Sequence, residues 1–233
     1  MQAVILAGGL ATRLGELAKS TPKSLVPVAG RPFLEHQLAL LQRSGFTHVL
    51  LCIGHLGEKI REFAGDGRRF GLHVDYSEDG PVPLGTAGAL RSALGSLASE
   101  FLVTYGDSYL PFDYSTPLQD LLAHPEASGT MAVYENRGRF DASNTEVRGD
   151  LVVRYEKASR DAALTHIDYG ATALRRHVIV DLAPGIATGF DRVQSELSRA
   201  GKLRALLATE RFYEVGSLAG LAELETFLDQ RPF

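Results

Sequence analysis

Short apolar runs alternate with helical patterns throughout the first half of the chain. Residues 3–7, 48–53, 73–77 and 101–106 are apolar runs typical of strands, and residues 32–44, 56–65 and 85–98 carry apolar side chains at helical spacing. This alternation predicts an α/β fold in which helices cover both faces of a parallel sheet. Ligands of such sheets bind at the carboxyl ends of the strands, so the loops that begin at Gly8 and Gly106 are candidates for a site.

The second half of the chain has a different rhythm. The strand-like segments 130–135 (TMAVYE), 145–149 (TEVRG), 151–157 (LVVRYEK) and 166–176 (HIDYGATALRR) have few helices between them. This pattern predicts a partly antiparallel lobe, closed by helices near 190–200 and 217–229. The 233 residues contain no internal repeat and no Pro/Gly-rich linker, so we expect one domain over 1–233 whose two lobes share a sheet or core.

Charge and hydropathy indicate which kinds of molecule the protein binds. The net charge of -4 and the isoelectric point near 6.0 give no basic field to hold a nucleic-acid backbone. We therefore expect small phosphorylated ligands and no nucleic acid. No apolar run approaches the roughly 20 residues of a membrane span. The first residues do not form a secretory signal, so we expect a cytoplasmic protein that does not bind a membrane.

The cysteine and the histidines predict no site of their own. Cys52 is the one cysteine and lies in the apolar run HVLLCIG, which predicts a buried, unreactive thiol. The seven histidines show neither H-x-H nor H-E-x-x-H spacing, which argues against a zinc site. His36 and His55 receive no role.

The opening stretch, MQAVILAGGLATRLGELAKSTPKSLVPVAG (1–30), gathers small residues and cations directly after a strand. Gly8 and Gly9 let backbone amides approach an anion, and Arg13 and Lys23 would supply positive charge to a phosphate. The alternative is a tight strand exit with two solvated cations. The stretch contains neither G-x-x-x-x-G-K-[ST] nor G-x-G-x-x-G, so it is neither a P-loop nor a dinucleotide-binding turn.

The segment LAGGLATRLGELAKSTPKSLVPVAGRPFLEHQL (6–38) resembles the signature of the sugar-1-phosphate nucleotidyltransferases, the NDP-sugar pyrophosphorylases. Residues 65–94 and 101–110 resemble the next blocks of that family, in the same order. The resemblance implies a Rossmann-like, mixed but mainly parallel sheet of the GT-A type, without the β-helix extension of bifunctional relatives. It also implies a nucleotide-binding lobe over 1–110 and a sugar-phosphate lobe over 111–233.

The resemblance also implies a reaction and the residues that perform it. An NTP and a sugar 1-phosphate would give an NDP-sugar and pyrophosphate with Mg²⁺, and no general base is needed because the attacking phosphate oxygen is already ionised. Arg13, Lys23 and Asp107 would be catalytic, with the two cations on the triphosphate. The nucleotide would lie against Leu6, Ala7, Gly8, Gly9, Thr12, Pro83, Gly85, Thr86, Ala87 and Gly88.

Carboxylates and a lysine from the second half complete the implied site. Asp107 in YGDSYL and Glu214 in FYEVGS would hold the metal ion, Glu214 directly or through a water. The sugar phosphate would lie against Glu156, Lys157, Asp168 and Gly170. The structural alternatives are a turn aspartate at 107, a helix cap at Glu214, and a glycine-rich helix start near 85–88 with Thr86 as its cap.

Four residues depart from the family pattern. Ala11 and Glu16 stand where glycine and proline are usual, and Ser24 stands where proline is frequent. Asp168 stands where relatives often carry asparagine, which affects the hydroxyl pattern that the sugar pocket can bind. None of the four removes a cation or carboxylate from the implied chemistry.

The predicted function is transfer of a nucleotidyl group to a sugar 1-phosphate. The stretch PLGTAG (83–88) favours a guanylyl group and a mannose- or heptose-type sugar. The alternatives are a uridylyltransferase on another sugar 1-phosphate, a cytidylyltransferase on a phosphorylated alcohol, and a non-catalytic nucleotide-sugar sensor. Lys157 favours a sugar 1-phosphate, and the retained Arg13, Lys23 and Asp107 argue against a sensor. The sequence indicates no oligomeric state.

Overall fold

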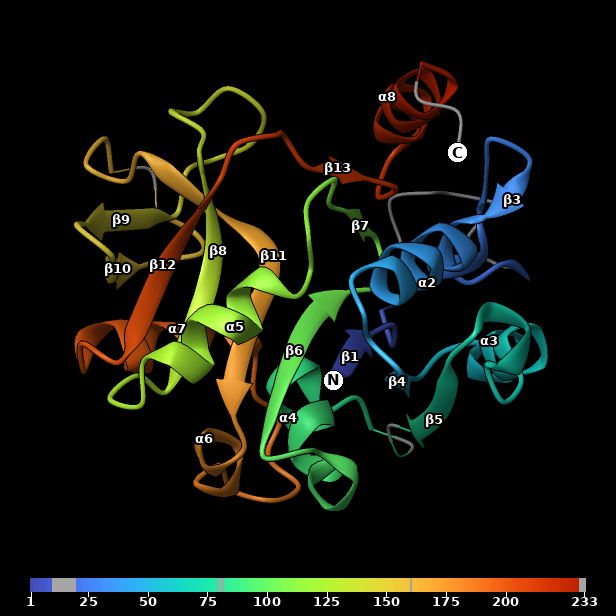
Figure 1. Ribbon diagram of the computed structural model, residues 1–233, viewed down its shortest axis with the longest axis horizontal. Coiled ribbons are helices and arrows are strands. Elements are labelled where there is room, and N and C mark those ends of the chain that lie inside the picture. Colours follow the sequence, from blue (N-terminus) through green and yellow to red (C-terminus); the bar gives the residue numbers. More distant parts are fainter. Residues whose placement is uncertain (10–19, 79, 81, 160, 231–233) are drawn as a thin grey trace.

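A computed structural model describes residues 1–9, 20–78, 80, 82–159 and 161–230. Within these residues, a nine-stranded sheet forms the centre of the molecule (Figure 1). Its strands, in spatial order, are β5 (His73–Glu78), β4 (His48–Ile53), β1 (Gln2–Leu6), β6 (Glu100–Tyr105), β11 (His166–Arg175), β8 (Gly129–Glu135), β12 (Leu203–Ala208), β10 (Leu151–Tyr155) and β9 (Thr145–Arg148). Strands from both halves of the sequence therefore belong to one sheet.

The sheet is parallel in its first half and mixed in its second. Strands β5, β4, β1 and β6 pair in parallel, as the alternating pattern predicted. Strand β11 runs antiparallel between β6 and β8, whereas β12 lies parallel to β8. Strands β10 and β9 form the far edge in antiparallel pairing. The carboxyl ends of β1, β4 and β6 consequently lie at the same edge of the sheet.

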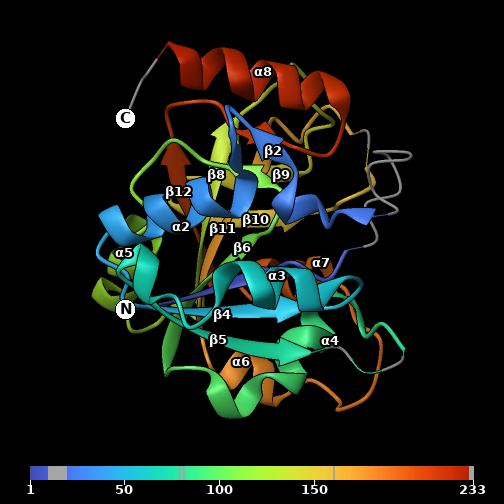
Figure 2. The same cartoon turned by 90° about the vertical axis from the view of Figure 1, so that its right-hand side faces the viewer.

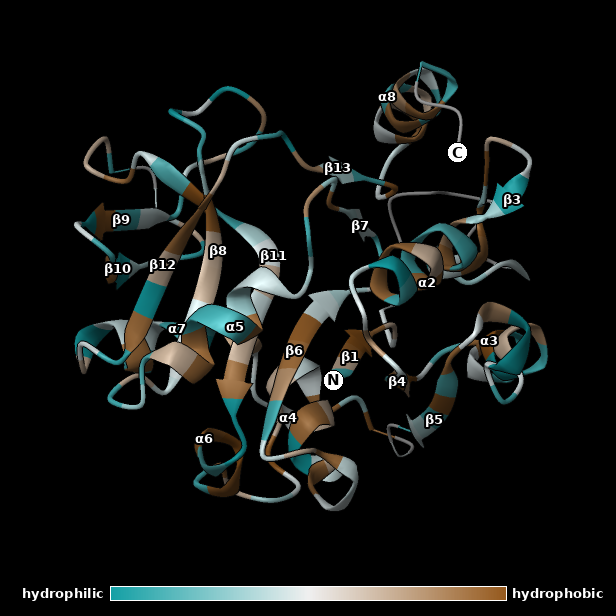
Figure 3. Ribbon diagram, viewed as in Figure 1, coloured by the Kyte–Doolittle hydropathy of each residue, from teal (hydrophilic) through white to brown (hydrophobic). Residues whose placement is uncertain are grey.

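Helices cover both faces of this sheet (Figure 2). Helices α2 (Phe33–Arg43), α3 (Gly57–Ala64) and α5 (Thr116–Ala123) pack on the face to which Ala3 and Ile5 point. Helices α4 (Gly85–Ser92), α6 (His177–Val180) and α7 (Phe190–Arg199) pack on the other face, with Val4 and Leu6. Strand β1 is hydrophobic along nearly its whole length (Figure 3) because both of its faces are buried.

Helix α8 (Leu218–Asp229) packs beside two short ribbons at the edge where the parallel strands end. The ribbons are β2 (Pro27–Val28) with β3 (Arg31–Pro32), and β7 (Ser108–Tyr109) with β13 (Tyr213–Glu214). Their shared core includes Val28, Phe33, Tyr109, Val215 and Leu224. The helix begins at Ser217, whose hydroxyl accepts a hydrogen bond from the Gly220 amide at 3.1 Å. Ser217 rather than Glu214 is therefore its N-cap.

Several elements differ from the sequence expectations. The predicted helix 85–98 ends at Ser92 and is followed by a 3-10 turn, η4 (Leu94–Ser96). Helix α5 and strand β12 were not predicted. The described residues form no β-helix, and among them no helix is both long and apolar enough to cross a membrane.

Candidate active site

A cavity of about 330 Å³ lies at the carboxyl ends of β1, β4 and β6. Its size is within the range of about 300–1,000 Å³ that is usual for small-molecule sites. Nine of the residues that the sequence assigned to nucleotide or catalysis line it, namely Leu6, Ala7, Gly8, Gly9, Lys23, Pro83, Gly85, Thr86 and Asp107. Thr12 and Arg13, together with Ala11 and Glu16, lie outside the described residues.

Close backbone packing brings the first loop and the turn after β6 to the same place. The Ala7 amide donates a hydrogen bond to the Cys52 carbonyl at 2.8 Å, and the Gly106 amide donates to the Leu6 carbonyl at 3.0 Å. A Cβ atom at Gly106 would lie only 3.0 Å from the Cβ of Ala7. Glycine at 106 therefore allows the turn that carries Asp107 to pack directly against the end of β1.

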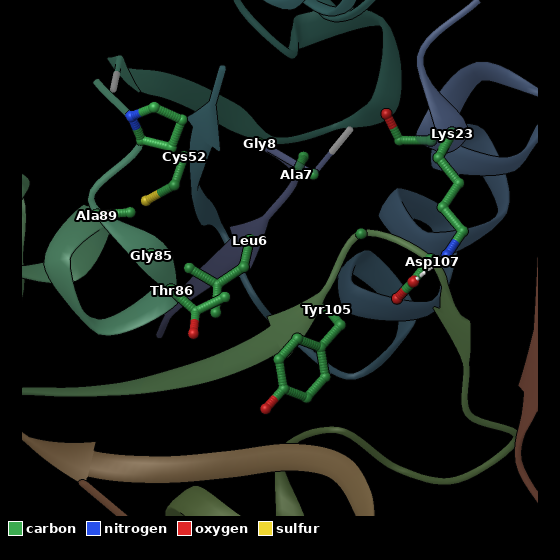
Figure 4. A pocket seen from close by; sticks show the side chains of 14 residues that line it. Leu6, Ala7, Gly8, Lys23, Cys52, Gly85, Thr86, Ala89, Tyr105 and Asp107 are labelled. Atoms are coloured by element: carbon green, nitrogen blue, oxygen red, sulfur yellow. Dashed lines mark hydrogen bonds and ion pairs between the residues drawn. The ribbon is translucent and has the colours of Figure 1, made fainter. Parts of the chain in front are cut away.

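The Lys23 side chain reaches Asp107 on the side of the cavity that lies across from α4 (Figure 4). Lys23 is the first residue of the 3-10 turn η2 (Lys23–Leu25). Pro22 precedes the turn with a φ of -62°, the value that the proline ring favours. The Leu25 amide donates a hydrogen bond to the Pro22 carbonyl at 2.8 Å. The Lys23 ammonium lies 2.5 Å from the Asp107 carboxylate, and the two side chains are only 19% and 31% exposed. A cation and a carboxylate are thus paired at the cavity.

Ser24, where relatives frequently have proline, also lines the cavity. Its side chain is buried, and its hydroxyl has no hydrogen-bond partner among the described residues. Buried hydroxyls are normally paired. Ser24 therefore places a buried hydroxyl without a partner, within the described part of the chain, beside the cavity.

The pairing of β7 with β13 brings Glu214 close to Asp107. Glu214 lies opposite Ser108 in this ribbon, and the Val215 amide donates to the Asp107 carbonyl at 2.9 Å. A Cβ atom at Gly216 would lie 2.9 Å from the Lys23 ammonium nitrogen and 4.0 Å from the Glu214 Oε2 atom. The Glu214 carboxylate and the Lys23 ammonium, which is paired with Asp107, therefore both lie near Gly216.

Gln37 of α2 holds the turn that carries Asp107. Its side chain is buried, and its Nε2 amide donates to the carbonyls of Tyr105 at 2.8 Å and Ser108 at 2.9 Å. These two carbonyls lie on either side of Asp107 in the chain. Gln37 was not predicted from the sequence, because its partners are backbone atoms of a distant turn.

The start of α4 contributes to the cavity only in part. Pro83, Gly85 and Thr86 line it, but the amides of Ala87 and Gly88 donate to the Thr188 carbonyl at 2.9 and 3.2 Å. The segment before α7 therefore occupies these two amides, and neither Ala87 nor Gly88 is among the described residues that line the cavity.

Thr86 does not cap α4, although the sequence left open that it caps a glycine-rich helix start near 85–88. Its hydroxyl accepts a hydrogen bond from the Phe190 amide at 2.7 Å, at the start of α7. Together with the contacts of Thr188, this bond fixes α4 against α7 at the wall of the cavity.

Glu156 and Lys157 lie beyond the end of β10, in a separate recess of about 310 Å³ that also includes Asp191 and Ser195. The Glu156 carboxylate is held by the Arg154 guanidinium in two contacts of 2.8 and 2.9 Å. The guanidinium also holds the pKa of the Glu156 carboxyl below its usual value. The two residues do not line the cavity that Lys23 and Asp107 share.

Asp168 and Gly170 lie between the cavity and this recess. The Asp168 carboxyl accepts hydrogen bonds from the Gly170 amide at 2.9 Å and from the Gln194 side chain at 2.7 Å. Burial raises the pKa of this carboxyl, and the charge of Lys157 partly opposes the rise. A Cβ atom at Gly170 would lie 3.6 Å from both Ser108 and the Tyr105 ring.

Tyr105 connects the two sides of the site. It ends β6 and lines the cavity, and burial raises the pKa of its hydroxyl well above the usual value. The charges of Asp168 and Asp107 contribute to this rise, so the ring lies within the field of both carboxylates. Tyr105, Cys52 and Ala89 also line the cavity and were not predicted from the sequence. The available signal was the position of Tyr105 and Cys52 at or near the carboxyl ends of strands that flank β1.

The chain is similar to known sugar-1-phosphate nucleotidyltransferases. The chain matches the model of the MobA-like NTP transferase domain over residues 3–208. It is 30% identical over 219 residues to the D-glycero-alpha-D-manno-heptose 1-phosphate guanylyltransferase of Campylobacter jejuni. This alignment covers 93% of this chain and 95% of that protein. It is 36% identical over 127 residues to the N-acetylmuramate alpha-1-phosphate uridylyltransferase of Neisseria meningitidis, covering 54% and 55% of the two chains.

The fold is also similar to a solved structure. HddC from Yersinia pseudotuberculosis, in complex with GMP-PN, superimposes with a TM-score of 0.78 at 22% identity, over 97% of this chain and 99% of that chain. The match to the family model extends over most of the present sequence, from the first strand to the end of β12. The chain therefore belongs to the family of MobA-like NTP transferase domains.

Proposed function

We propose that this protein transfers a nucleotidyl group from an NTP to a sugar 1-phosphate and releases pyrophosphate. The observation that carries the proposal is the single cavity that joins Gly8 and Gly9, Lys23, Asp107 and the start of α4. Backbone amides after a strand and a half-buried cation suit a triphosphate, because phosphoryl chemistry depends chiefly on positioning and on neutralising charge.

The reaction is a substitution at the α-phosphorus. An oxygen of the sugar phosphate forms a bond to that phosphorus, and the bond to the bridging oxygen of the β-phosphate breaks, so that pyrophosphate leaves. Lys23 neutralises charge on the departing phosphates, since its ammonium group reaches the cavity from the wall opposite α4. Arg13 would act with it from the opening loop.

The residues around Lys23 suit a magnesium ion. Mg²⁺ prefers hard oxygen ligands, commonly one or two carboxylates together with phosphate oxygens. The Asp107 carboxylate already pairs with the Lys23 ammonium, and the Glu214 carboxylate lies near the same place, beside Gly216. Asp107 and Glu214 would hold the ion, which when bound would neutralise phosphate charge.

The second half of the chain would bind the sugar phosphate. Asp168 and Gly170 adjoin the cavity through Tyr105, and Lys157 influences the Asp168 carboxyl. Lys157 would contact the phosphate and Asp168 the sugar hydroxyls. In this arrangement residues 1–110 serve mainly the nucleotide and residues 111–233 mainly the sugar phosphate.

The favoured substrates are GTP, as donor of a guanylyl group, and the 1-phosphate of a heptose- or mannose-type sugar. The support is the guanylyltransferase of Campylobacter jejuni, because the alignment covers nearly the full length of both chains. A uridylyltransferase is the second candidate, supported by the shorter but more identical match to the Neisseria meningitidis protein.

Pyrophosphate release tests this proposal. The protein with Mg²⁺ is mixed with GTP, UTP, CTP or dTTP, each with a heptose 1-phosphate, mannose 1-phosphate or phosphocholine. We expect release with GTP and a heptose- or mannose-type 1-phosphate. Release only with CTP and phosphocholine would establish a cytidylyltransferase instead. Binding of nucleotide-sugars without release from any mixture would establish a sensor.

A further inference from the structure

Two histidines that are distant in the sequence meet on the edge of the sheet. Strands β4 and β5 lie side by side (Figure 2), and their register places His48 directly beside His73. The ring centroids are 4.5 Å apart. The spacing of histidines along the sequence argued against a zinc site, but strand pairing brings together two residues that no local motif connects.

Asp75 completes the group. It lies two residues after His73 on β5 and therefore on the same face of the sheet. One carboxylate oxygen lies 2.8 Å from the His48 Nε2 atom, and the other lies 3.4 Å from the His73 Nε2 atom. The carboxylate thus bridges the two rings.

We infer that His48, His73 and Asp75 form a second site, which binds a late first-row divalent cation such as Zn²⁺. One ligand atom from each residue lies within 4.8 Å of the others. Bonds of about 2.0–2.2 Å to Zn²⁺ require tetrahedral ligand atoms about 3.3 Å apart. The two contacts of Asp75 are near that spacing but involve different carboxylate oxygens, so the exposed imidazoles and the carboxylate must rotate to bring one oxygen to that distance from both rings.

The ligand set selects the class of ion. Imidazole nitrogens suit Zn²⁺, Cu²⁺ and Ni²⁺, whereas Mg²⁺ prefers oxygen ligands and octahedral geometry. Three protein ligands leave a fourth tetrahedral position for water. The side chains are between 40% and 58% exposed, so an ion reaches them directly from solvent.

The site is separate from the proposed nucleotidyl-transfer site. His48 begins β4, whereas Cys52, near the other end of the strand, lines the cavity, so roughly 13 Å of strand separates the two places. Strand β5 is the last strand of the sheet on this side. A cation held by residues of β4 and β5 would join this edge strand to its neighbour and stabilise the folded chain.

Zinc binding by the untagged protein tests the inference. Calorimetric titration with ZnCl₂ is done in excess Mg²⁺, which occupies carboxylate sites without competing for imidazole. We expect one Zn²⁺ per chain, and we expect His48→Asn and His73→Asn each to weaken binding at least about tenfold. His124→Asn is the matched control, because His124 also lies against a carboxylate, that of Asp120, at 3.4 Å. This control is expected to bind like the unmodified protein.

A second measurement uses the unmodified protein alone. Of the seven histidines, the imidazole NMR signals of His48 and His73 are expected to change first as Zn²⁺ is added. Absence of binding, or equal binding by the unmodified protein, His48→Asn and His73→Asn, would overturn the inference. Neither readout depends on nucleotidyl transfer, so failure here leaves the proposed function unaffected.

Discussion

At the scale of single residues, the pair of Lys23 and Asp107 carries the proposed chemistry. Lys23→Ala removes a cation from the cavity without removing a core side chain, so we expect turnover to fall by about 100-fold or more while the fold is retained. Lys202→Ala is the matched control, because Lys202 is an exposed lysine that donates to the Glu126 carbonyl at 3.0 Å. Steady-state rates and circular dichroism check both variants. Normal turnover of Lys23→Ala would remove Lys23 from the mechanism.

Asp168 gives a prediction about pH. Burial raises the pKa of its carboxyl in the folded protein above the unfolded value. Between these two pKa values the folded chain binds more protons, so the free energy of unfolding falls as pH rises through that window. The variant Asp168→Asn does not titrate, so its free energy of unfolding does not fall for this reason. Rotation of the Gln194 side-chain amide would let its unpaired Oε1 atom accept a hydrogen bond from the new asparagine amide.

We therefore expect the stability of Asp168→Asn relative to the unmodified protein to increase as pH rises from about 4 to about 8. Urea unfolding at several pH values measures the difference. A difference that does not change with pH would show that the carboxyl titrates alike in the folded and unfolded chains. The substitution also restores the asparagine that relatives often have, which makes sugar selectivity a second readout.

At the scale of elements, α2 positions the turn that carries Asp107. Gln37→Met keeps the approximate volume of the buried side chain but removes both hydrogen bonds to that turn. We expect a stability loss of about 1–3 kcal/mol, together with a higher Mg²⁺ concentration for half-maximal turnover. The control is Gln119→Met in α5, which removes a hydrogen bond to Ser115, the residue before that helix. A loss of stability without any change in Mg²⁺ dependence would limit Gln37 to a structural role.

The ribbon of β7 and β13 predicts how Glu214 behaves. Because this ribbon places Glu214 beside the turn of Asp107, Glu214→Gln is expected to reduce turnover severely and Glu214→Asp to keep part of it. Asp107→Asn is expected to abolish nearly all Mg²⁺-dependent turnover. Glu223→Gln, on the nearby helix α8, is the control, since Glu223 pairs with Arg211. Full activity of Glu214→Gln with unchanged Mg²⁺ dependence would leave Asp107 as the protein ligand.

The local elements were largely predictable from the sequence, and the reason is their periodicity. The predicted strand 48–53 matches β4, and the predicted helix 32–44 contains α2 with one residue to spare at each end. Strand β12 was missed, because its place between β8 and β10 depends on pairing with residues far away in the sequence. Such non-local pairings leave no periodic signal in the chain.

At the scale of the whole molecule, the cavity with Lys23 and Asp107 was more predictable than the recess with Lys157. Lys23 and Asp107 were predicted from motifs, and the sheet brings them together. Other hydrogen bonds around the cavity and the recess join distant parts of the chain. Examples are the bonds from the α4 amides to the Thr188 carbonyl and from the Gln194 side chain to Asp168. The register that places His48 beside His73 is of the same kind.

The fate of isotopic label tests the central claim most directly. The protein is incubated with the preferred NTP, labelled at either the α- or the γ-phosphate, and with the matching sugar 1-phosphate. Attack at the α-phosphorus predicts that α-label appears in the NDP-sugar and γ-label in pyrophosphate. The Lys23→Ala variant is expected to slow both in parallel. Release of γ-label as inorganic phosphate, with no α-label in a sugar product, would contradict nucleotidyl transfer.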